Sequence, residues 1–158
     1  MEGVPPESSA TMYSMKLYKQ GHCVYYCKYH IVITTKYRRK VFRPKGVYEY
    51  FAKLLLQIRS HYPDIVIEDG NHDMDHIHLL VSIPPRRSVS EVVRIIKCNT
   101  GKKIRDRYEY VQNMYWGSDG IWSDGYFVST IGVNEETIQR YIEEQGKEDS
   151  GQTLFETD

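Results

Sequence analysis

The chain has 158 residues, and its 21 lysines and arginines are balanced by 21 aspartates and glutamates, so the formal net charge is zero. That length suits a single domain with its own core, and the neutral total gives no hint of a nucleic-acid partner. The cysteines are odd in number and include no CxxC pair (Cys23, Cys27 and Cys98), which argues against a disulfide framework or a structural zinc site. No apolar run approaches the roughly 18 residues of a membrane span, and no signal-peptide pattern is present, so we expect an unexported, cytoplasmic protein.

Zero net charge hides two basic segments and an acidic C-terminal part. Residues 36–45 hold six basic side chains and no acidic one. Residues 86–107 hold eight basic side chains against only Glu91 and Asp106. From Glu135 onward, eight acidic side chains stand against only Arg140 and Lys147. Each basic segment either forms a solvated face or contacts a nucleic acid, and the residues alone leave both possibilities open.

The first part of the chain predicts a leader, a strand and a helix. Residues 1–20 contain Pro5-Pro6 and no sustained apolar periodicity, so we expect a flexible leader. Cys23–Thr35 is rich in β-branched residues and tyrosines, which predicts a central strand. Val47–His61 is predicted to be a helix because its apolar residues recur at helical spacing. These residues are Phe51, Leu54, Leu55 and Ile58.

Two further strands are predicted next, and the second carries a pair of histidines. Ile65–Ile67 is a short strand closed by a turn signal at residues 69–71. In Asp75–Val81, side chains alternate between faces, so His76 and His78 share the face opposite the aliphatic residues. The aliphatic face comprises Ile77, Leu79, Val81 and Ile83. Two adjacent imidazoles form half of a metal site, although a surface strand that happens to carry two histidines is an equal alternative.

The last part predicts a helix, a connection, a strand and a final helix. Ser88 and Glu91 form a capping box that opens a helix reaching about Lys103, across Gly101. Residues 108–120 form an aromatic, turn-rich connection, and residues 121–131 a strand with an expected bulge at Gly125. Asn134 begins a last helix that ends near residue 145, and residues 147–158 form a disordered acidic tail.

The order strand, helix, strand, strand, helix, strand predicts an α+β fold, the ferredoxin-like (RRM-like) βαββαβ antiparallel sheet with an additional C-terminal helix. The folded domain would span residues 21–146. In this fold the first and third strands are neighbours at the centre of the sheet. We therefore expect His76 and His78 to lie mid-sheet, on the face that the two main helices leave open.

A third metal ligand is expected on the last helix. Tyr141 and Gln145 lie four residues apart and so share one helix face. The amide oxygen of Gln145 could complete a site begun by the two histidines. Tyr141 is either a packed residue of an amphipathic helix or a nucleophile; a phenol is protonated at neutral pH and would need a metal to polarise its target phosphate.

These residues resemble the single-tyrosine HUH transposases of the insertion-sequence 200/605 family. The resemblance rests on His76-Ile77-His78, preceded by Asp75, and on the tyrosine-x-x-x-glutamine signature from Tyr141 to Gln145, and it covers about residues 21–145. It implies that His76, His78 and Gln145 bind Mg²⁺ or Mn²⁺. It also implies that Tyr141 cleaves single-stranded DNA at imperfect hairpins through a 5′-phosphotyrosine intermediate, in a homodimer with composite sites.

The basic segments offer the expected DNA contacts, namely Arg38, Arg39, Lys40, Arg94 and Lys97, with exposed aromatic residues such as Tyr37 beside them. Asp75 either orients a histidine or is a plain loop aspartate. Imidazole ligands generally favour zinc, copper or iron, whereas the family resemblance implies magnesium or manganese.

Three other functions remain open at this stage. Ferredoxin-like sheets with aromatic residues on the open face also bind RNA, although the chain lacks an RNP1-like string. A domesticated relative would use the same chemistry on host repeat hairpins. A metallohydrolase would release its product to water and form no covalent adduct with DNA.

Overall fold

The computed structural model describes residues 16–133, 136, 138–140 and 142–143. The chain divides into two compact units, one formed by residues 27–131 and one by residues 1–26 together with 132–158. The first unit contains the main sheet, the helices that cover it and both predicted histidines.

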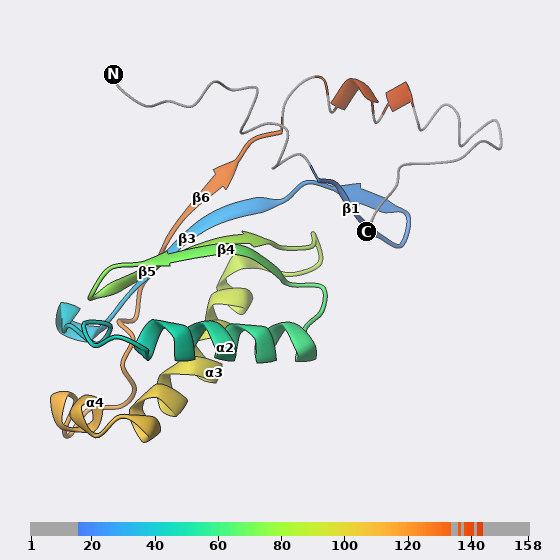
Figure 1. The fold of residues 1–158 in the computed structure, drawn as a ribbon. Helices are drawn as coiled ribbons and strands as arrows, with labels where there is room; N and C mark the ends of the chain where they lie inside the picture. Colours follow the sequence, from blue (N-terminus) through green and yellow to red (C-terminus); the bar gives the residue numbers. More distant parts are fainter. Residues whose placement is uncertain (1–15, 134–135, 137, 141, 144–158) are drawn as a thin grey trace, which may run out of the picture. The chain divides into compact units, whose positions relative to one another are not determined.

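The larger unit is an α+β fold around one antiparallel sheet (Figure 1). Its strands are β3 (Lys28–Thr34), β4 (Val66–His72), β5 (His76–Ser82) and β6 (Phe127–Ile131). Its helices are the short 3-10 helix η1 (Lys36–Arg38), α2 (Val47–His61), α3 (Val89–Arg107) and α4 (Glu109–Met114). The strand order is β4-β5-β3-β6, so the first and third strands, β3 and β5, are central neighbours, as expected.

Helices α2 and α3 lie on one face of the sheet and close the core against it (Figure 1). On the strands, the predicted alternation is confirmed: Ile77, Leu79 and Val81 are buried, while His76 and His78 are only partly buried. The predicted apolar stripe of α2 is confirmed as well, because Phe51, Leu54, Leu55 and Ile58 are all buried. Core burial therefore fixes which face of β5 presents its histidines.

Helix α3 begins as the capping box predicts, because the Ser88 side chain accepts a hydrogen bond from the backbone N–H of Glu91. The helix continues through Gly101, where a β-carbon would lie 3.3 Å from Cδ1 of Trp122. The Trp122 indole N–H donates to Oγ1 of Thr100 at 3.0 Å. Gly101 thus allows Trp122 to pack closely on the helix. This packing offsets the free-energy cost of a glycine inside a helix.

Several predicted boundaries were wrong. Residues 69–71 are not a turn but part of β4, which continues past a bulge between Ile67 and Asp69. The chain reverses later, where the N–H of Asp73 donates to the carbonyl oxygen of His76. The last strand begins at Phe127 rather than at residue 121, and Gly125 lies before it. The 108–120 connection contains the short helix α4.

In the described part of the smaller unit, β1 (Tyr18–Gln20) and β2 (Cys23–Tyr25) form a hairpin. The expected strand Cys23–Thr35 is therefore divided between β2 and β3, and residues 18–20 form a strand rather than part of a flexible leader. Gly21 adopts the left-handed conformation that the tight turn needs, with φ 57°. Residues 136, 138–140 and 142–143 are helical, in agreement with the expected last helix. Within the described residues, no helix is long and apolar enough to cross a membrane.

Candidate active site

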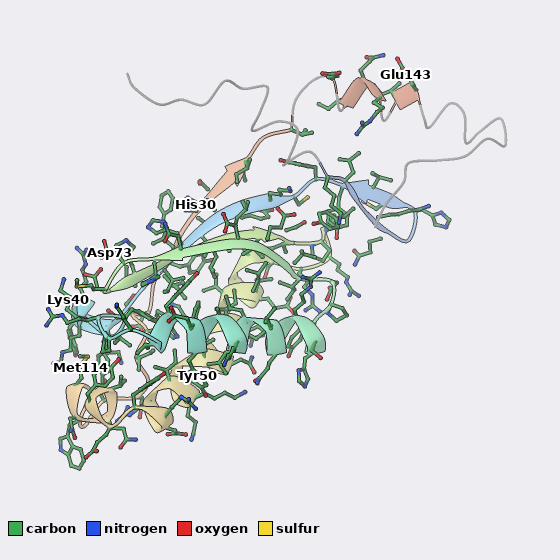
Figure 2. The ribbon with its side chains drawn as sticks, viewed as in Figure 1. His30, Lys40, Tyr50, Asp73, Met114 and Glu143 are labelled. Atoms are coloured by element: carbon green, nitrogen blue, oxygen red, sulfur yellow. The ribbon has the colours of Figure 1, made fainter. Side chains whose placement is uncertain are left out.

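Three histidines gather on the sheet face opposite the helices. The rings of His76 and His78 lie 4.9 Å apart at 71°, and the rings of His30 and His78 lie 5.2 Å apart at 13°. His30 comes from β3 and points away from α2 (Figure 2). A depression of about 330 Å³ adjoins His30 and His78, with Leu80 and residues 69–71 along its other sides. The sheet therefore presents an imidazole cluster beside open space.

Asp75 orients His76. Its Oδ1 atom accepts a hydrogen bond from Nδ1 of His76 at 2.7 Å, and the residue is only 5% exposed. The hydrogen bond from His76 lowers the pKa of Asp75 despite its burial, and the charges of Arg38 and Lys40 act in the same direction. A carboxylate bound to Nδ1–H leaves the Nε2 lone pair of His76 available to a metal ion.

His78 is held in a corresponding way by His30. Nδ1 of His78 lies 3.1 Å from Nε2 of His30, and the proton between them belongs to either ring according to tautomer. Burial lowers the pKa of His78, and the neighbouring imidazoles of His76 and His30 lower it further, while Asp73 acts against this. Neutral imidazole is the form that binds metal ions. Metal binding through Nε2 of His78 requires the tautomer in which Nδ1 donates to His30.

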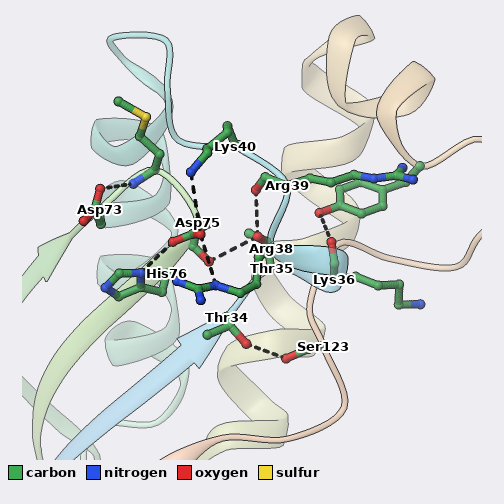
Figure 3. A network of polar contacts seen from close by, with 12 residues as sticks. Thr34, Thr35, Lys36, Arg38, Arg39, Lys40, Asp73, Asp75, His76 and Ser123 are labelled. Atoms are coloured by element: carbon green, nitrogen blue, oxygen red, sulfur yellow. Dashed lines mark hydrogen bonds and ion pairs between the residues drawn. The ribbon is translucent and has the colours of Figure 1, made fainter.

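The loop after β3 is tied to the histidine strand at Asp75 (Figure 3). The backbone N–H of Thr35 donates to the carbonyl oxygen of Asp75 at 2.9 Å, and the hydroxyl oxygen of Thr35 lies 3.1 Å from the same carbonyl oxygen. Nε of Arg38 donates to Oδ2 of Asp75 at 3.2 Å, and Nζ of Lys40 lies 3.9 Å from the same oxygen. Two of the predicted DNA-binding residues, Arg38 and Lys40, thus lie beside the carboxylate that orients His76.

Residues 23–145 match the protein family described as "Transposase IS200 like". The chain belongs to this family. Two relatives are the transposases for insertion sequence element IS200 of Salmonella typhimurium and Salmonella typhi, each 33% identical over 129 residues that cover 82% of this chain and 83% of the relative. The ISDra2 transposase TnpA of Deinococcus radiodurans is 26% identical over 129 residues, covering 77% of this chain and 86% of the relative.

A solved structure agrees with this assignment to the IS200-like transposases. The crystal structure of a Deinococcus radiodurans protein assigned as a transposase superposes with a TM-score of 0.61 at 26% sequence identity. The match covers 80% of this chain and 97% of that one. The small α+β fold with its antiparallel sheet is therefore shared with a transposase, and the chain is a DNA-processing enzyme by family.

The other basic residues predicted to contact DNA in this IS200-like transposase are Arg39, in the same loop, and Arg94 and Lys97 on α3. Arg39 places its guanidinium 5.2 Å from the ring centres of both Tyr37 and Tyr115. Arg94 is exposed on α3, on the side of the sheet away from the histidines. Lys97, also on α3, donates to the carbonyl oxygens of residues 123 and 125 at 2.7 and 2.9 Å. Burial lowers the pKa of Lys97, and its amine holds the segment before β6.

The predicted nucleophile Tyr141 and the predicted third ligand Gln145 lie outside the described residues. Across the part of the chain that the structure describes, no three His, Cys, Asp or Glu side chains are grouped to hold a metal ion. The assignment of His76 and His78 as metal ligands therefore stays a prediction. Both rings fit the role of ligand, because each has its Nδ1 atom engaged by a neighbour.

Sequence reasoning overlooked His30. The signal was present, since Ile31 and Ile33 are apolar and alternate with His30 along β3. What was missing was the register: His30 pairs with Leu80, and Val32 pairs with His78. Only this register brings the His30 ring diagonally within reach of His78.

Proposed function

We propose that this chain cleaves and rejoins single-stranded DNA at hairpin-marked element ends, with Tyr141 as the nucleophile and a divalent metal ion as cofactor. The observation that carries the proposal is the arrangement of His76 and His78, whose Nδ1 atoms are engaged by Asp75 and His30. We class the sheet as ferredoxin-like, a proposal supported by its element order and by the strand order β4-β5-β3-β6.

His76, His78 and Gln145 would hold the ion. Two imidazole nitrogens alone would favour zinc or copper, whereas the amide oxygen of Gln145 and the phosphate oxygens of DNA make the donor set harder. Mg²⁺ or Mn²⁺ is therefore the proposed cofactor. When bound, such an ion would polarise the scissile phosphate and offset the charge that develops on its oxygens.

The chain's own residues prepare this site before DNA arrives. Asp75 keeps the proton of His76 on Nδ1, and His30 orients the ring of His78. Arg38 and Lys40 add positive charge at the same end of the sheet and would attract the DNA backbone. The depression beside His30 and His78 leaves room for a strand on the open face.

Cleavage is a transfer between phosphodiesters. The Tyr141 oxygen forms a bond to phosphorus, the bond from phosphorus to the 3′ oxygen breaks, and the phenolic proton is balanced by the proton that the 3′ oxygen gains. The products are a 5′-phosphotyrosine link and a free 3′-hydroxyl. Attack of another 3′-hydroxyl on this link reverses the bond changes, so strand joining needs no external energy source.

We further propose that the enzyme is a homodimer with composite sites, in which Tyr141 of one subunit acts with the histidines of the other. Imperfect DNA hairpins would be the substrates. A cytoplasmic location belongs to the same proposal, and the odd number of cysteines without a CxxC pair fits a reducing compartment.

A denaturing gel tests the proposal. The full chain is incubated with end-labelled single-stranded DNA carrying the hairpin from the end of the element that encodes it, with Mn²⁺ or Mg²⁺. We expect a DNA-linked protein band that requires the metal and disappears in Tyr141→Phe. An adduct formed equally by Tyr141→Phe would refute the nucleophile, and absence of any adduct with wild type would refute the cleavage reaction. His76→Ala and His78→Ala should abolish cleavage while hairpin binding persists.

A further inference from the structure

Two consecutive residues of the loop after β3 adopt a left-handed backbone, which is unusual for L-amino acids with large side chains. Tyr37 has φ 58° and Arg38 has φ 52°, and neither is a glycine, asparagine or aspartate. Such a conformation costs free energy and persists only where the surroundings impose it. Here Thr35, which is buried, imposes it: its hydroxyl donates to the carbonyl oxygen of Arg39 at 2.7 Å, and its carbonyl accepts from the N–H of Arg38 at 2.9 Å.

The strained turn directs two large side chains outward. Tyr37 is 75% exposed, and the Arg38 side chain is 71% exposed. Burial in the core therefore does not account for either residue. Strain concentrates where it has a functional use, so an exposed aromatic ring held out by a strained backbone points to a binding role.

Each of these side chains is also oriented by a neighbour. The guanidinium of Arg39 lies 5.2 Å from the ring centre of Tyr37, which fixes the ring and adds positive charge beside it. Among the residues that the structure describes, the hydrogen bond of the Arg38 side chain runs from Nε to Oδ2 of Asp75. That contact leaves the two terminal nitrogens of the guanidinium for a ligand.

The turn is linked to the histidine pair by a single carboxylate. One oxygen of Asp75 accepts from Arg38 and the other accepts from His76 (Figure 3). An anion bound at the outer nitrogens of Arg38 would therefore lie close to a candidate metal ligand. The Asp75 carboxylate lies 3.2 Å from Nε of Arg38 and 2.7 Å from Nδ1 of His76, and so bridges the two side chains.

We propose that the Tyr37–Arg38 turn holds one unpaired nucleotide beside the histidine pair. The base stacks on the exposed ring of Tyr37, and the phosphate of the same nucleotide binds the terminal nitrogens of Arg38. Base stacking on aromatic rings and phosphate contacts from arginine are the two components of single-strand recognition. This inference rests on the proposed function, since it requires single-stranded DNA as the ligand. It adds a residue that recognises the unpaired state, because bases in a duplex present no free face.

Fluorescence anisotropy separates the base contact from the phosphate contact. The probes are a labelled oligothymidylate and an abasic chain of equal length, which has the same phosphates and no bases. Wild type should prefer the oligothymidylate. Tyr37→Leu should weaken oligothymidylate binding about five-fold or more and leave abasic binding unchanged, whereas Tyr37→Phe, which keeps the ring, should bind both as wild type does.

Two arginine variants, one in the turn and one as a control, test the phosphate contact. Arg38→Ala should weaken both probes equally and lower the slope of log affinity against log salt by about one. Arg59→Ala removes an exposed arginine from α2, on the helix side of the sheet, and should change neither the affinity nor the slope.

A backbone variant distinguishes binding from a structural role. Asparagine tolerates left-handed φ, so Tyr37→Asn should unfold at the same temperature as wild type or higher, yet lose the preference for bases. A fall in melting temperature with unchanged DNA binding would overturn the inference. So would equal wild-type affinity for the two probes, or oligothymidylate binding by Tyr37→Leu at the wild-type level. Failure of wild type to bind any single strand would instead overturn the proposed function itself.

Discussion

Nε2 of His30 lies 3.1 Å from Nδ1 of His78, across the two central strands of the sheet. Their rings are nearly parallel, and His30 pairs with Leu80 while His78 pairs with Val32, two residues further along the paired strands. His30 is thus placed to hold His78 in the tautomer that leaves Nε2 free. The Asp75 carboxylate accepts from Nδ1 of His76 in the same way.

Removal of His30 should weaken metal binding without removing a ligand. We expect His30→Leu to bind Mn²⁺ about 10- to 100-fold more weakly, as loss of such supporting contacts typically does. His30→Gln should restore part of the affinity, because its amide can occupy the position of Nε2. Isothermal titration of Mn²⁺ in the absence of DNA gives the measurement. His61→Leu replaces an exposed histidine of α2 and serves as the control. Equal affinity in His30→Leu and wild type would show that His30 has no such role.

Asp75 should couple the metal site to the basic loop. Asp75→Asn keeps the shape but removes the charge that attracts both His76 and Arg38. We expect Mn²⁺ affinity to fall about ten-fold or more, and DNA cleavage at limiting metal to fall with it. Cleavage at saturating Mn²⁺ should recover partly, because the ligands themselves remain. An unchanged Mn²⁺ affinity in Asp75→Asn would show that Asp75 does not support the metal site.

The sequence predicted those parts of this site that depend on local periodicity. Alternation along β5 placed His76 and His78 opposite Ile77 and Leu79, and the structure confirms it. His30 could not be predicted in this way, because its contact with His78 depends on the register between strands far apart in sequence. Register follows from packing of the whole sheet.

Composition was a weaker guide than periodicity. The Asp-Gly-Asn signal at residues 69–71 predicted a turn, yet these residues continue an edge strand, where polar side chains remain exposed and a bulge adjusts the pairing. The charge pattern predicted basic segments but not the side of the sheet on which their side chains lie. Lys97 binds backbone carbonyls instead of remaining a free surface cation, because burial of its stem brings the amine to residues 123 and 125. The assignments of Tyr141 and Gln145 stay predictions.

The Asp64 carboxylate should stabilise the folded protein at neutral pH. Its carboxylate accepts from Arg87 at 2.6 and 3.1 Å and from Arg86 at 2.7 Å. The hydrogen bond from Arg87, more than that from Arg86, lowers the pKa of Asp64 from 3.8 to about 2. A lowered pKa stabilises the folded state at pH values above that of the unfolded group, and this contribution is lost as pH falls from about 4 through about 2.

Urea unfolding at pH 7 and at pH 2.5 or so measures this effect. Asp64→Asn should lower the free energy of unfolding at pH 7 by about 2 kcal/mol, and by clearly less at the acidic pH, where wild type has begun to lose the same contribution. Asp106→Asn breaks the exposed pair with Lys102 and should cost no more than about 0.5 kcal/mol at pH 7. A difference between Asp64→Asn and wild type that does not shrink with acid would assign the loss to packing instead of charge.

Subunit mixing should show whether the proposed sites are composite. Tyr141→Phe and His78→Ala are each expected to be inactive alone. If Tyr141 acts on the histidines of its partner, a mixed dimer contains one site with both groups intact and one with neither. Random exchange of subunits would then restore about a quarter of the wild-type sites, read as covalent adduct on a denaturing gel. The double variant mixed with wild type provides the control, because it also leaves one intact site per mixed dimer if tyrosine and histidines act within one chain. No adduct from the Tyr141→Phe and His78→Ala mixture, despite demonstrated exchange, would place both groups in the same subunit.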